Sequence, residues 1–218
     1  MNLALFDLDN TLLAGDSDYA WSQFLIREGV LDREAFEARN EAYYDQYKAG
    51  TLDIFDYLAF QSTPLVGRSA EELEGWHARY MDQVVRPMIL PKARELLASH
   101  SGDLCAIVTA TNDFITAPIA QALRVDHLIA SELERGPAGF TGRGTGTPAF
   151  QSGKIVRVKQ WLAGMGHELS SFGRSSFYSD SHNDIPLLEA VTHPVAVDPD
   201  ATLLAHARGR GWPVLSLR

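Results

Sequence analysis

The sequence predicts an α/β protein in which helices cover a parallel sheet and a second, all-helical region is inserted after the first strand. Short apolar runs recur along the chain, and over its second half they alternate with amphipathic helical patterns. Continuous apolar runs are typical of strands buried on both faces of a parallel sheet. Roughly ninety residues separate the first run from the second, far more than one crossover helix needs.

Five of these runs are predicted strands, and a sixth follows near the last residues. The runs are Leu3–Phe6, Leu104–Val108, His127–Ala130, Ser176–Ser179, Pro194–Val197 and Val214–Leu217. The helices predicted between the later strands are Phe114–Leu123, Gly153–Met165, Asn183–Ala190 and Ala201–Arg208. Residues 134–153 are rich in Gly, Pro and Thr and are expected to form a hairpin or flap. This order of elements is typical of a Rossmann-like parallel sheet with helices on both sides.

The long interval after the first strand contains only helical patterns, broken at Gly50 and around Pro64 and Gly67. We expect residues 15–85 to form a small helical bundle. Most of its aromatic residues should fill the core of the bundle, and one or two should reach a binding pocket. These residues include Trp21, Phe36, Tyr43, Tyr44, Tyr47, Phe55, Tyr57 and Phe60.

The composition excludes several classes of function. With 218 residues, a net charge of −9 and a pI of about 5.2, the chain lacks the positive charge of a large nucleic-acid interface. No apolar stretch approaches the roughly 20 residues that cross a bilayer, and the first residues have no basic region typical of a secretory signal. We therefore expect a cytoplasmic protein that binds neither nucleic acid nor membrane. The sequence leaves the oligomeric state open.

The strongest chemical signal is a pair of carboxylates, Asp7 and Asp9, at the end of the first predicted strand. Ligands in open α/β folds bind at the carboxyl edge of the parallel strands. Acidic pairs also cap helices or face solvent. It is the position of this pair at the end of a strand that favours a functional role.

A second acidic group, Asp180 and Asp184, follows the predicted strand Ser176–Ser179. Taken alone, it is also explained as the start of a helix, with Asp180 or Ser181 as the cap. Four carboxylates at one sheet edge would repel one another unless a divalent cation lay between them, and hard oxygen ligands suit Mg²⁺. The sequence therefore predicts a magnesium site, which would also allow an anionic substrate to bind.

Two further segments supply candidate phosphate-binding groups. Thr109 ends the second strand and brings its hydroxyl, with the N–H of Ala110, to the point where the next helix starts. Helix N-termini are ready-made phosphate sites, although Thr111 or Asn112 in this segment could equally be an ordinary helix cap. Lys154 lies at the entrance of a helix, off its apolar stripe, and is a candidate fixed positive charge; Lys159 is expected to face solvent.

These four segments, in this order, resemble the motifs of the haloacid dehalogenase (HAD) superfamily of hydrolases, over residues 3 to about 198. Phe6-Asp7-Leu8-Asp9-Asn10-Thr11 looks like the first motif, Thr109 like the second, Lys154 like the third, and Asp180 with Asp184 like the fourth. The helical insertion resembles the cap domain of the phosphoserine-phosphatase-like branch. The resemblance implies a HAD-like core at residues 1–14 and 86–218, with a helical cap domain at residues 15–85.

The resemblance also implies a Mg²⁺-dependent phosphatase that works through an aspartyl-phosphate intermediate. Asp7 would be the nucleophile, and Asp9 would protonate the leaving oxygen and then take a proton from the attacking water. Mg²⁺ would be held by Asp7, by the backbone carbonyl of Asp9 and by Asp180, with Asp184 acting directly or through water. The groups expected to bind the phosphoryl oxygens belong to Thr109, Ala110 and Lys154.

The expected substrate is a small phosphorylated metabolite. In phosphoserine phosphatases the cap supplies a Glu soon after the first motif and an Arg further on. Asp16 lies near the position of the former, but no arginine occurs between Arg39 and Arg68. Phosphoserine is therefore disfavoured, and the aromatic cap favours an organic phosphate with a ring or chain, such as histidinol phosphate. Asn183 is a further candidate for substrate specificity, and His182 is expected to be a solvent-facing loop residue.

Two other activities share these motifs. A phosphomutase or phosphotransferase of the same superfamily would keep the phosphoryl group and pass it on. A phospho-accepting regulatory module also combines an acidic Mg²⁺ pocket with Thr and Lys, but such modules are shorter and do not need Asp9 as a proton donor. Release of inorganic phosphate distinguishes a phosphatase from a phosphomutase.

Overall fold

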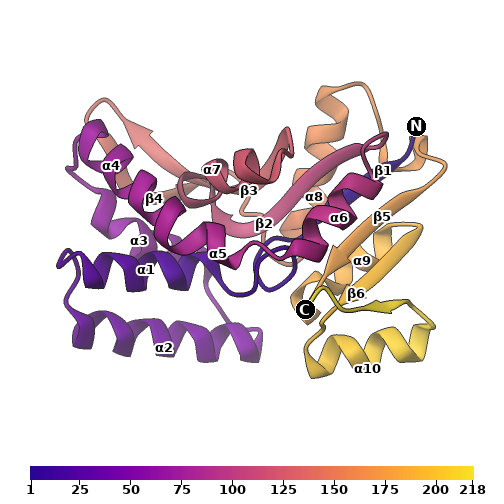
Figure 1. Cartoon of the computed structure of the whole chain (residues 1–218), viewed down its shortest axis with the longest axis horizontal. Helices are drawn as coiled ribbons and strands as arrows, with labels where there is room; N and C mark the ends of the chain where they lie inside the picture. Colours follow the sequence, from indigo (N-terminus) through magenta and orange to yellow (C-terminus); the bar gives the residue numbers. More distant parts are fainter.

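The computed structural model describes all 218 residues, and its centre is a seven-stranded sheet (Figure 1). The strand order is β4-β3-β2-β1-β5-β6-β7, and every neighbouring pair is parallel except β3 with β4. The predicted α/β fold is confirmed. The strands are β1 Leu3–Phe6, β2 Leu104–Asn112, β3 His127–Gly136, β4 Gly139–Thr145, β5 Ser175–Ser179, β6 His193–Val197 and β7 Val214–Leu215.

The first strand, β1, lies at the middle of the sheet between β2 and β5. Its four residues are all buried, because helices cover both faces of the sheet, and this burial explains the continuous apolar run. Phe6 is level with Ile107 of β2 and with Tyr178 of β5. Since the three strands run in the same direction, the residues that follow these positions meet at one edge of the sheet.

Helices from the second half of the chain cover both faces. Leu3 and Leu5 of β1 pack with α8, α9 and α10, whereas Ala4 and Phe6 face α6, α7 and the insertion. The predicted helix over 183–190 begins as a 3₁₀ turn, His182–Asp184, and becomes α-helical where Pro186 fits the first turn. The helices are α6 Pro91–Ser99, α7 Asp113–Leu123, α8 Ser152–Gly164, α9 Ile185–Ala190 and α10 Ala201–Arg210.

The insertion after β1 contains helices and no named strand. Its elements are α1 Ser17–Arg27, α2 Arg33–Ala49, α3 Ile54–Ser62, a 3₁₀ turn Thr63–Leu65, α4 Ala70–Tyr80, a π-helical turn Met81–Val85 and α5 Arg86–Met88. The first three helices each start at an aspartate whose side chain accepts a backbone hydrogen bond, as helix caps do. The division into a core and a cap domain at residues 15–85 stays a prediction.

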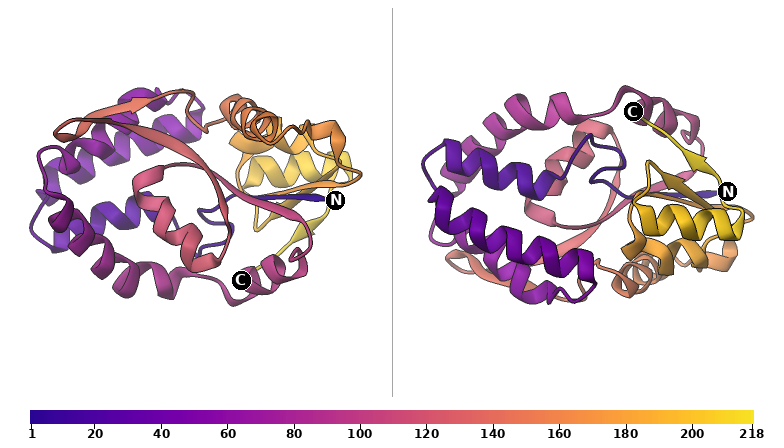
Figure 2. Two further views of the ribbon diagram at one scale, coloured as in Figure 1. Left: turned by 90° about the horizontal axis from the view of Figure 1, so that it is seen from above. Right: turned by 90° about the horizontal axis from the view of Figure 1, so that it is seen from below.

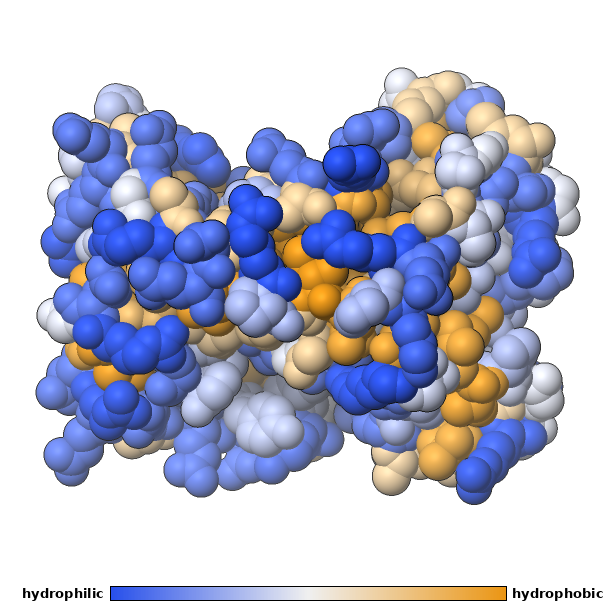
Figure 3. Space-filling model, in the orientation of Figure 1, coloured by the Kyte–Doolittle hydropathy of each residue, from blue (hydrophilic) through white to orange (hydrophobic).

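The insertion is joined to the sheet by apolar packing. Trp21 and Tyr80 lie in the same apolar cluster as Phe6 of β1. A smaller cluster formed by Phe36, Tyr43 and Phe60 joins α2 to α3. On the face shown in Figure 3 the insertion is mostly hydrophilic, while apolar residues reach the surface near the middle of the molecule.

The predicted hairpin over residues 134–153 is present, but its first strand starts earlier, within β3. β3 extends beyond its predicted end because it continues into this hairpin. β4 lies against α3, so the hairpin reaches from the sheet to the insertion (Figure 2). The approach is close: a Cβ atom on Gly144 would lie 2.8 Å from the side chain of Leu58.

Candidate active site

Asp7 follows β1 directly and is buried at the carboxyl edge of the sheet. The chain turns sharply after it, since the Leu8 carbonyl accepts hydrogen bonds from three N–H groups further along. Asn10 adopts a left-handed conformation with a φ of 57°, which asparagine does more readily than most residues. Because of this turn, Asp7 and Asp9 have different partners although only one residue separates them.

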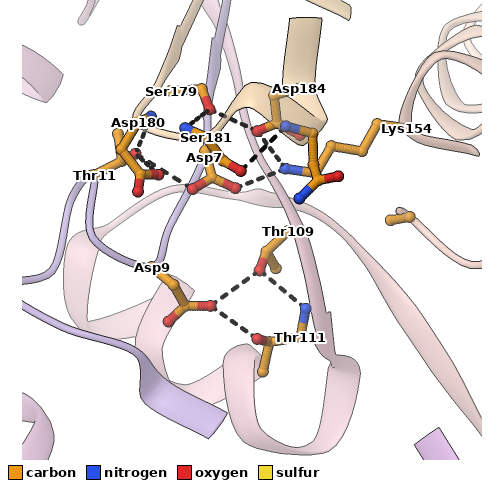
Figure 4. A network of polar contacts seen from close by, with 12 residues as sticks. Asp7, Asp9, Thr11, Thr109, Thr111, Lys154, Ser179, Asp180, Ser181 and Asp184 are labelled. Atoms are coloured by element: carbon orange, nitrogen blue, oxygen red, sulfur yellow. Dashed lines mark hydrogen bonds and ion pairs between the residues drawn. The ribbon is translucent and has the colours of Figure 1, made fainter. Parts of the chain in front are cut away.

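Lys154 connects two carboxylates at this edge (Figure 4). Its Nζ donates hydrogen bonds of 2.7 Å to Asp7 Oδ1 and to Asp184 Oδ2, and the residue is 3% exposed. Burial alone would lower the pKa of Lys154, but the Asp184 and Asp7 carboxylates raise it above its ordinary value. Burial raises the pKa of Asp7 to about 7, against the opposing effect of Lys154. The Ser179 hydroxyl donates a further 2.7 Å hydrogen bond to Asp184 Oδ2.

Asp180 comes directly after β5 and lies beside Asp7. The Thr11 hydroxyl is 3.1 Å from Asp180 Oδ1 and 3.3 Å from Asp7 Oδ2, and its single proton can be donated to only one of them at a time. Burial, and then the negative charges of Asp7 and Asp184, raise the pKa of Asp180 to about 8. Negative charge at Asp180 is therefore only weakly compensated by the protein.

The donor set fits a magnesium ion. Lys154 pairs with Asp7 and Asp184, and Asp180 has only the Thr11 hydroxyl as a side-chain partner. The three carboxylates therefore leave an excess of negative charge that a divalent cation would neutralise. Mg²⁺ takes oxygen ligands and keeps several waters, so the Asp7 and Asp180 carboxylates with the Asp9 carbonyl are enough protein ligands. No group of three or more His, Cys, Asp or Glu side chains is placed to hold a metal ion. Asp184 instead has direct partners in Lys154 and Ser179.

The carboxylate of Asp9 belongs to a separate network (Figure 4). Its Oδ1 accepts a 2.7 Å hydrogen bond from the Ser17 backbone N–H, and its Oδ2 accepts from the hydroxyls of Thr111 at 2.8 Å and Thr109 at 3.4 Å. Burial and the nearby charge of Asp16 raise the pKa of Asp9 to about 6. A carboxyl group with such a pKa can give and take a proton close to neutral pH.

Both networks line one cavity of about 990 Å³ between the sheet edge and the insertion. No arginine lines it, and the one lysine on the insertion side, Lys48, is paired with Asp45 at 2.8 Å. The insertion side is acidic and rich in tyrosine. Its lining includes Asp16, Asp18, Tyr19, Glu37, Glu41, Tyr43, Tyr44, Tyr47 and Tyr57.

A contact from α2 reaches the loop after β5. The Tyr47 hydroxyl lies 2.9 Å from Ser181 Oγ, and its ring lies near that of Phe150. In the same loop Asn183 Oδ1 accepts a 3.0 Å hydrogen bond from Gln151, while its buried Nδ2 has no partner and is free to donate to a ligand. Gln151 has a φ of 48° and a ψ of −124°, a strained backbone of the kind found at functional sites.

The structure brings every predicted site residue to this cavity, and their chemical roles stay predictions. The residues are Asp7, Asp9, Asp16, Thr109, Ala110, Lys154, Asp180, Asn183 and Asp184. Asp16 is also the cap of α1, because its Oδ1 accepts from two backbone N–H groups. His182 differs from the expectation. It is half-buried and held by Asp200, which accepts hydrogen bonds from its N–H at 2.7 Å and pairs with its Nδ1 at 2.8 Å.

Sequence reasoning missed several residues that the structure places at the site. Thr11 stands in the first motif, where the pattern predicts no role for it, yet its hydroxyl lies between Asp7 and Asp180. The sequence pattern marks Thr111 only as a possible helix cap, whereas in the structure Asn112 caps α7 and the Thr111 hydroxyl donates a hydrogen bond to Asp9. Asp18 carried no sequence signal beyond its acidic charge in the first turn of a helix.

The family of the chain follows from comparison with known proteins. Residues 4–189 match the model of the haloacid dehalogenase-like hydrolase family. The chain belongs to this family. It is 46% identical over 220 residues to a protein of Neisseria meningitidis serogroup C (strain 8013) named histidinol-phosphatase, covering 100% of this chain and 99% of that protein. It is 32% identical over 225 residues to a protein of Mycobacterium tuberculosis (strain ATCC 25618 / H37Rv) named phosphoserine phosphatase, covering 99% and 70%.

Solved structures share the fold of this chain. A protein of unknown function from Bordetella pertussis Tohama I has a TM-score of 0.93 and 49% identity, over 100% of this chain and 99% of that one. A substrate-bound phosphoserine phosphatase has a TM-score of 0.67 and 18% identity, over 98% and 91%, and so shows the shared fold alone. Family and relatives confirm the HAD resemblance and the predicted enzyme class, a phosphoric monoester hydrolase. No helix of the chain combines the length and apolar character needed to span a membrane.

Proposed function

We propose that this chain is a Mg²⁺-dependent phosphatase that hydrolyses histidinol phosphate through an aspartyl phosphate on Asp7. The observation that carries the reaction type is the buried Asp7 carboxylate, held 2.7 Å from Lys154 in the cavity that Asp9 also lines. The choice of substrate is supported by the insertion side of the cavity, which is acidic, rich in tyrosine and without arginine. It is further supported by the 46% identical relative named histidinol-phosphatase.

In the first step the Asp7 carboxylate attacks phosphorus. A bond forms between Asp7 and phosphorus, and the bond from phosphorus to the alcohol oxygen of the substrate breaks. Asp9 gives its proton to the departing oxygen, and its pKa of about 6 leaves part of the enzyme in the required protonated form near neutral pH. Lys154 reduces the repulsion between Asp7 and the phosphoryl oxygens, to which Thr109 and Asn183 can donate hydrogen bonds. Bound Mg²⁺ would supply further positive charge at these oxygens.

In the second step water attacks the phosphorus of the aspartyl phosphate. The bond to Asp7 breaks, inorganic phosphate leaves, and the Asp7 carboxylate is restored. Asp9, ionised after the first step, takes a proton from the water and returns to its starting state. Hydrogen bonds from the Ser17 N–H and the Thr111 hydroxyl hold the Asp9 carboxylate in place through both steps.

The wall of the cavity on the insertion side favours a cationic, ring-containing leaving group. Histidinol carries an amine and an imidazole but no carboxylate. A protonated amine suits the carboxylates of this wall, and a partly cationic ring suits its tyrosines. Phosphoserine carries a carboxylate, for which the cavity offers no arginine and only Lys48, already paired with Asp45.

The test is phosphate release from histidinol phosphate and from phosphoserine, each with Mg²⁺ and with EDTA. We expect Mg²⁺-dependent release with a kcat/KM at least about 100-fold higher for histidinol phosphate, since the charged group of the wrong substrate is left without a partner. Preference for phosphoserine would contradict the substrate, and full activity in EDTA would contradict the metal. Transfer of the phosphoryl group to an added alcohol without phosphate release would favour the phosphotransferase alternative.

A further inference from the structure

One buried carboxylate in the cavity is not used by the mechanism. Asp18 lies in the first turn of α1, is 3% exposed and lines the cavity, and its Oδ1 has no hydrogen-bond partner. The carboxylates on the sheet side all accept hydrogen bonds from the protein; Asp7 and Asp184, for example, both accept from Lys154. A buried polar oxygen without a partner is unfavourable, so a ligand group that pairs with it would gain binding energy.

The ordinary role of an aspartate at a helix start does not account for Asp18. Asp16 already caps α1 by accepting hydrogen bonds from the backbone N–H groups of Asp18 and Tyr19. No cationic side chain serves Asp18 either. Among the cavity-lining lysines, Lys154 is held by Asp7 and Asp184, and Lys48 is held by Asp45.

The surroundings of Asp18 are held by hydrogen bonds. The Tyr57 hydroxyl accepts a 2.7 Å hydrogen bond from Gln61, whose Oε1 accepts a 3.1 Å hydrogen bond from Ser22. Burial and the negative charges of Asp18 and Asp16 raise the pKa of Tyr57 well above its ordinary value, which places this hydroxyl in the field of both carboxylates. The phenol therefore stays neutral beside Asp18.

Asp18 lies on the side of the cavity where the alcohol departs. The preceding residue, Ser17, donates its N–H to Asp9 Oδ1 at 2.7 Å, and Asp9 is the proposed proton donor to the leaving oxygen. A group bound by Asp18 therefore belongs to the alcohol close to its ester oxygen. The phosphoryl group is bound elsewhere, at Asp7 and Lys154.

We infer that Asp18 binds a protonated amine on the leaving alcohol, so that the enzyme selects phosphate esters of amino alcohols. The inference rests on the proposed phosphatase function. The amine places its charge against Asp18 Oδ1, which accepts no hydrogen bond, and the neutral Tyr57 phenol beside this carboxylate supplies no positive charge. Since no arginine lines the cavity, an amino acid ester has no partner for its carboxylate, and the preferred class is amino alcohols that lack one.

The test compares pairs of substrates that differ only in the amine. Histidinol phosphate is paired with 3-(imidazol-4-yl)propyl phosphate, and ethanolamine phosphate with ethyl phosphate. We expect the wild-type protein to favour the amine in each pair by about 100-fold in kcat/KM, because its loss leaves a buried carboxylate unpaired. Asp18→Asn should remove this preference by slowing the amine substrates about 100-fold, while the amine-free substrates change less than about threefold.

A matched control uses another carboxylate of the same wall. Glu37 lines the cavity but is paired with Arg33 at 2.8 Å, so Glu37→Gln should keep the preference for the amine. Asp18→Glu should restore part of it. Hydrolysis of p-nitrophenyl phosphate and a thermal melt show whether each variant is folded.

Equal loss on both members of a pair in a folded Asp18→Asn protein would overturn the inference. So would a wild-type protein that hydrolyses the two members equally well, a result that does not depend on any variant folding. An Asp18-dependent preference for ethanolamine phosphate without activity on histidinol phosphate would keep the inference and contradict the proposed substrate. Absence of phosphate release from every compound, p-nitrophenyl phosphate included, would contradict the proposed function itself and with it this inference.

Discussion

The buried carboxylates on the sheet side of the cavity and the one on the insertion side differ in whether their oxygens have partners in the protein. On the sheet side Asp7 and Asp184 share Lys154, and Asp9 accepts hydrogen bonds from Ser17 and the threonine hydroxyls. On the insertion side the buried Asp18 has an oxygen without any partner. Groups that are already held need no reorganisation during a reaction, whereas an unsatisfied group is completed by a ligand. We therefore propose that the strand ends carry the chemistry and that the insertion recognises the leaving alcohol.

Removing the lysine from the sheet side should have the largest effect. Lys154→Met leaves Asp7 and Asp184 buried without their cation, and breaking a buried pair in this way costs about 3–5 kcal/mol of unfolding free energy. We also expect at least about a 1000-fold loss of kcat on every substrate, amine or not. Urea unfolding and steady-state kinetics measure the two effects. A loss confined to amine substrates would remove the distinction between the two sides.

Adding Mg²⁺ should stabilise the sheet side in a pH-dependent way. The pKa values of Asp7 and Asp180 are raised to about 7 and about 8 without metal, so the contribution of these groups to stability falls as pH rises from their unfolded pKa of about 4 through these values. Mg²⁺ binds the ionised forms, so its stabilising effect should grow over the same window. At about 100 times its dissociation constant it adds about 2.7 kcal/mol, or about 5–10 °C in Tm.

The measurement is the difference in Tm with and without Mg²⁺ at pH 5.5 and at pH 8.5. We expect the larger difference at pH 8.5. Asp180→Asn is the control and should lose most of the difference at both values. A difference that is the same at the two pH values, or larger at pH 5.5, would contradict the assignment of these carboxylates as metal ligands.

Adding a side chain at Gly153, next to Lys154, should have a smaller effect on stability and on kcat. A Cβ atom at Gly153 would lie 2.1 Å from the Pro148 carbonyl oxygen, so Gly153→Ala must shift the start of α8 and Lys154 with it. We expect a loss of about 1–3 kcal/mol in unfolding free energy and a lower kcat. In the same helix Gly164 has no atom within 4 Å of an added Cβ, and Gly164→Ala should leave both quantities nearly unchanged. Equal effects of the two substitutions in thermal melts would show that the close contact between position 153 and the Pro148 carbonyl does not limit the side chain there.

The smallest effect is expected where the two sides touch. Tyr47→Phe removes the hydrogen bond to Ser181 and keeps the ring near Phe150. One hydrogen bond contributes about 0.5–1.5 kcal/mol, so we expect a change of up to about tenfold in KM with kcat nearly constant. A change in kcat alone would indicate that this contact acts in the chemical step rather than in holding the two sides together.

The sheet-side residues could be predicted because strand order brings strand ends together. Asp7, Thr109 and Asp180 follow apolar runs, and the parallel arrangement of those runs alone places the three at one edge. Lys154 could be singled out because it lies at the entrance of its helix, off the apolar stripe, and matches the third motif of the family. Lys159, which the pattern predicts to face solvent, is exposed.

The contacts of the remaining site residues depend on tertiary packing, which no local sequence pattern predicts. Thr111 and Asn112 are both residues of the helix-capping type, and only the position of Asp9 decides which one caps α7. Tyr47 meets Ser181 across 134 positions of sequence, so the contact depends on how the insertion sits over the sheet. The lack of a hydrogen-bond partner for Asp18 Oδ1 could not be predicted from the sequence either, because it is established only when all neighbouring atoms are known.

Trapping the phosphorylated enzyme during turnover tests directly whether Asp7 carries the phosphoryl group. The protein with Mg²⁺ would be mixed with histidinol phosphate, quenched in acid, reduced with borohydride and digested, and the peptide with the reduced acyl phosphate located by mass spectrometry. We expect modification at Asp7 and none in Asp7→Asn, which should also be inactive. Modification at a different residue, or normal turnover by Asp7→Asn, would contradict this role of Asp7.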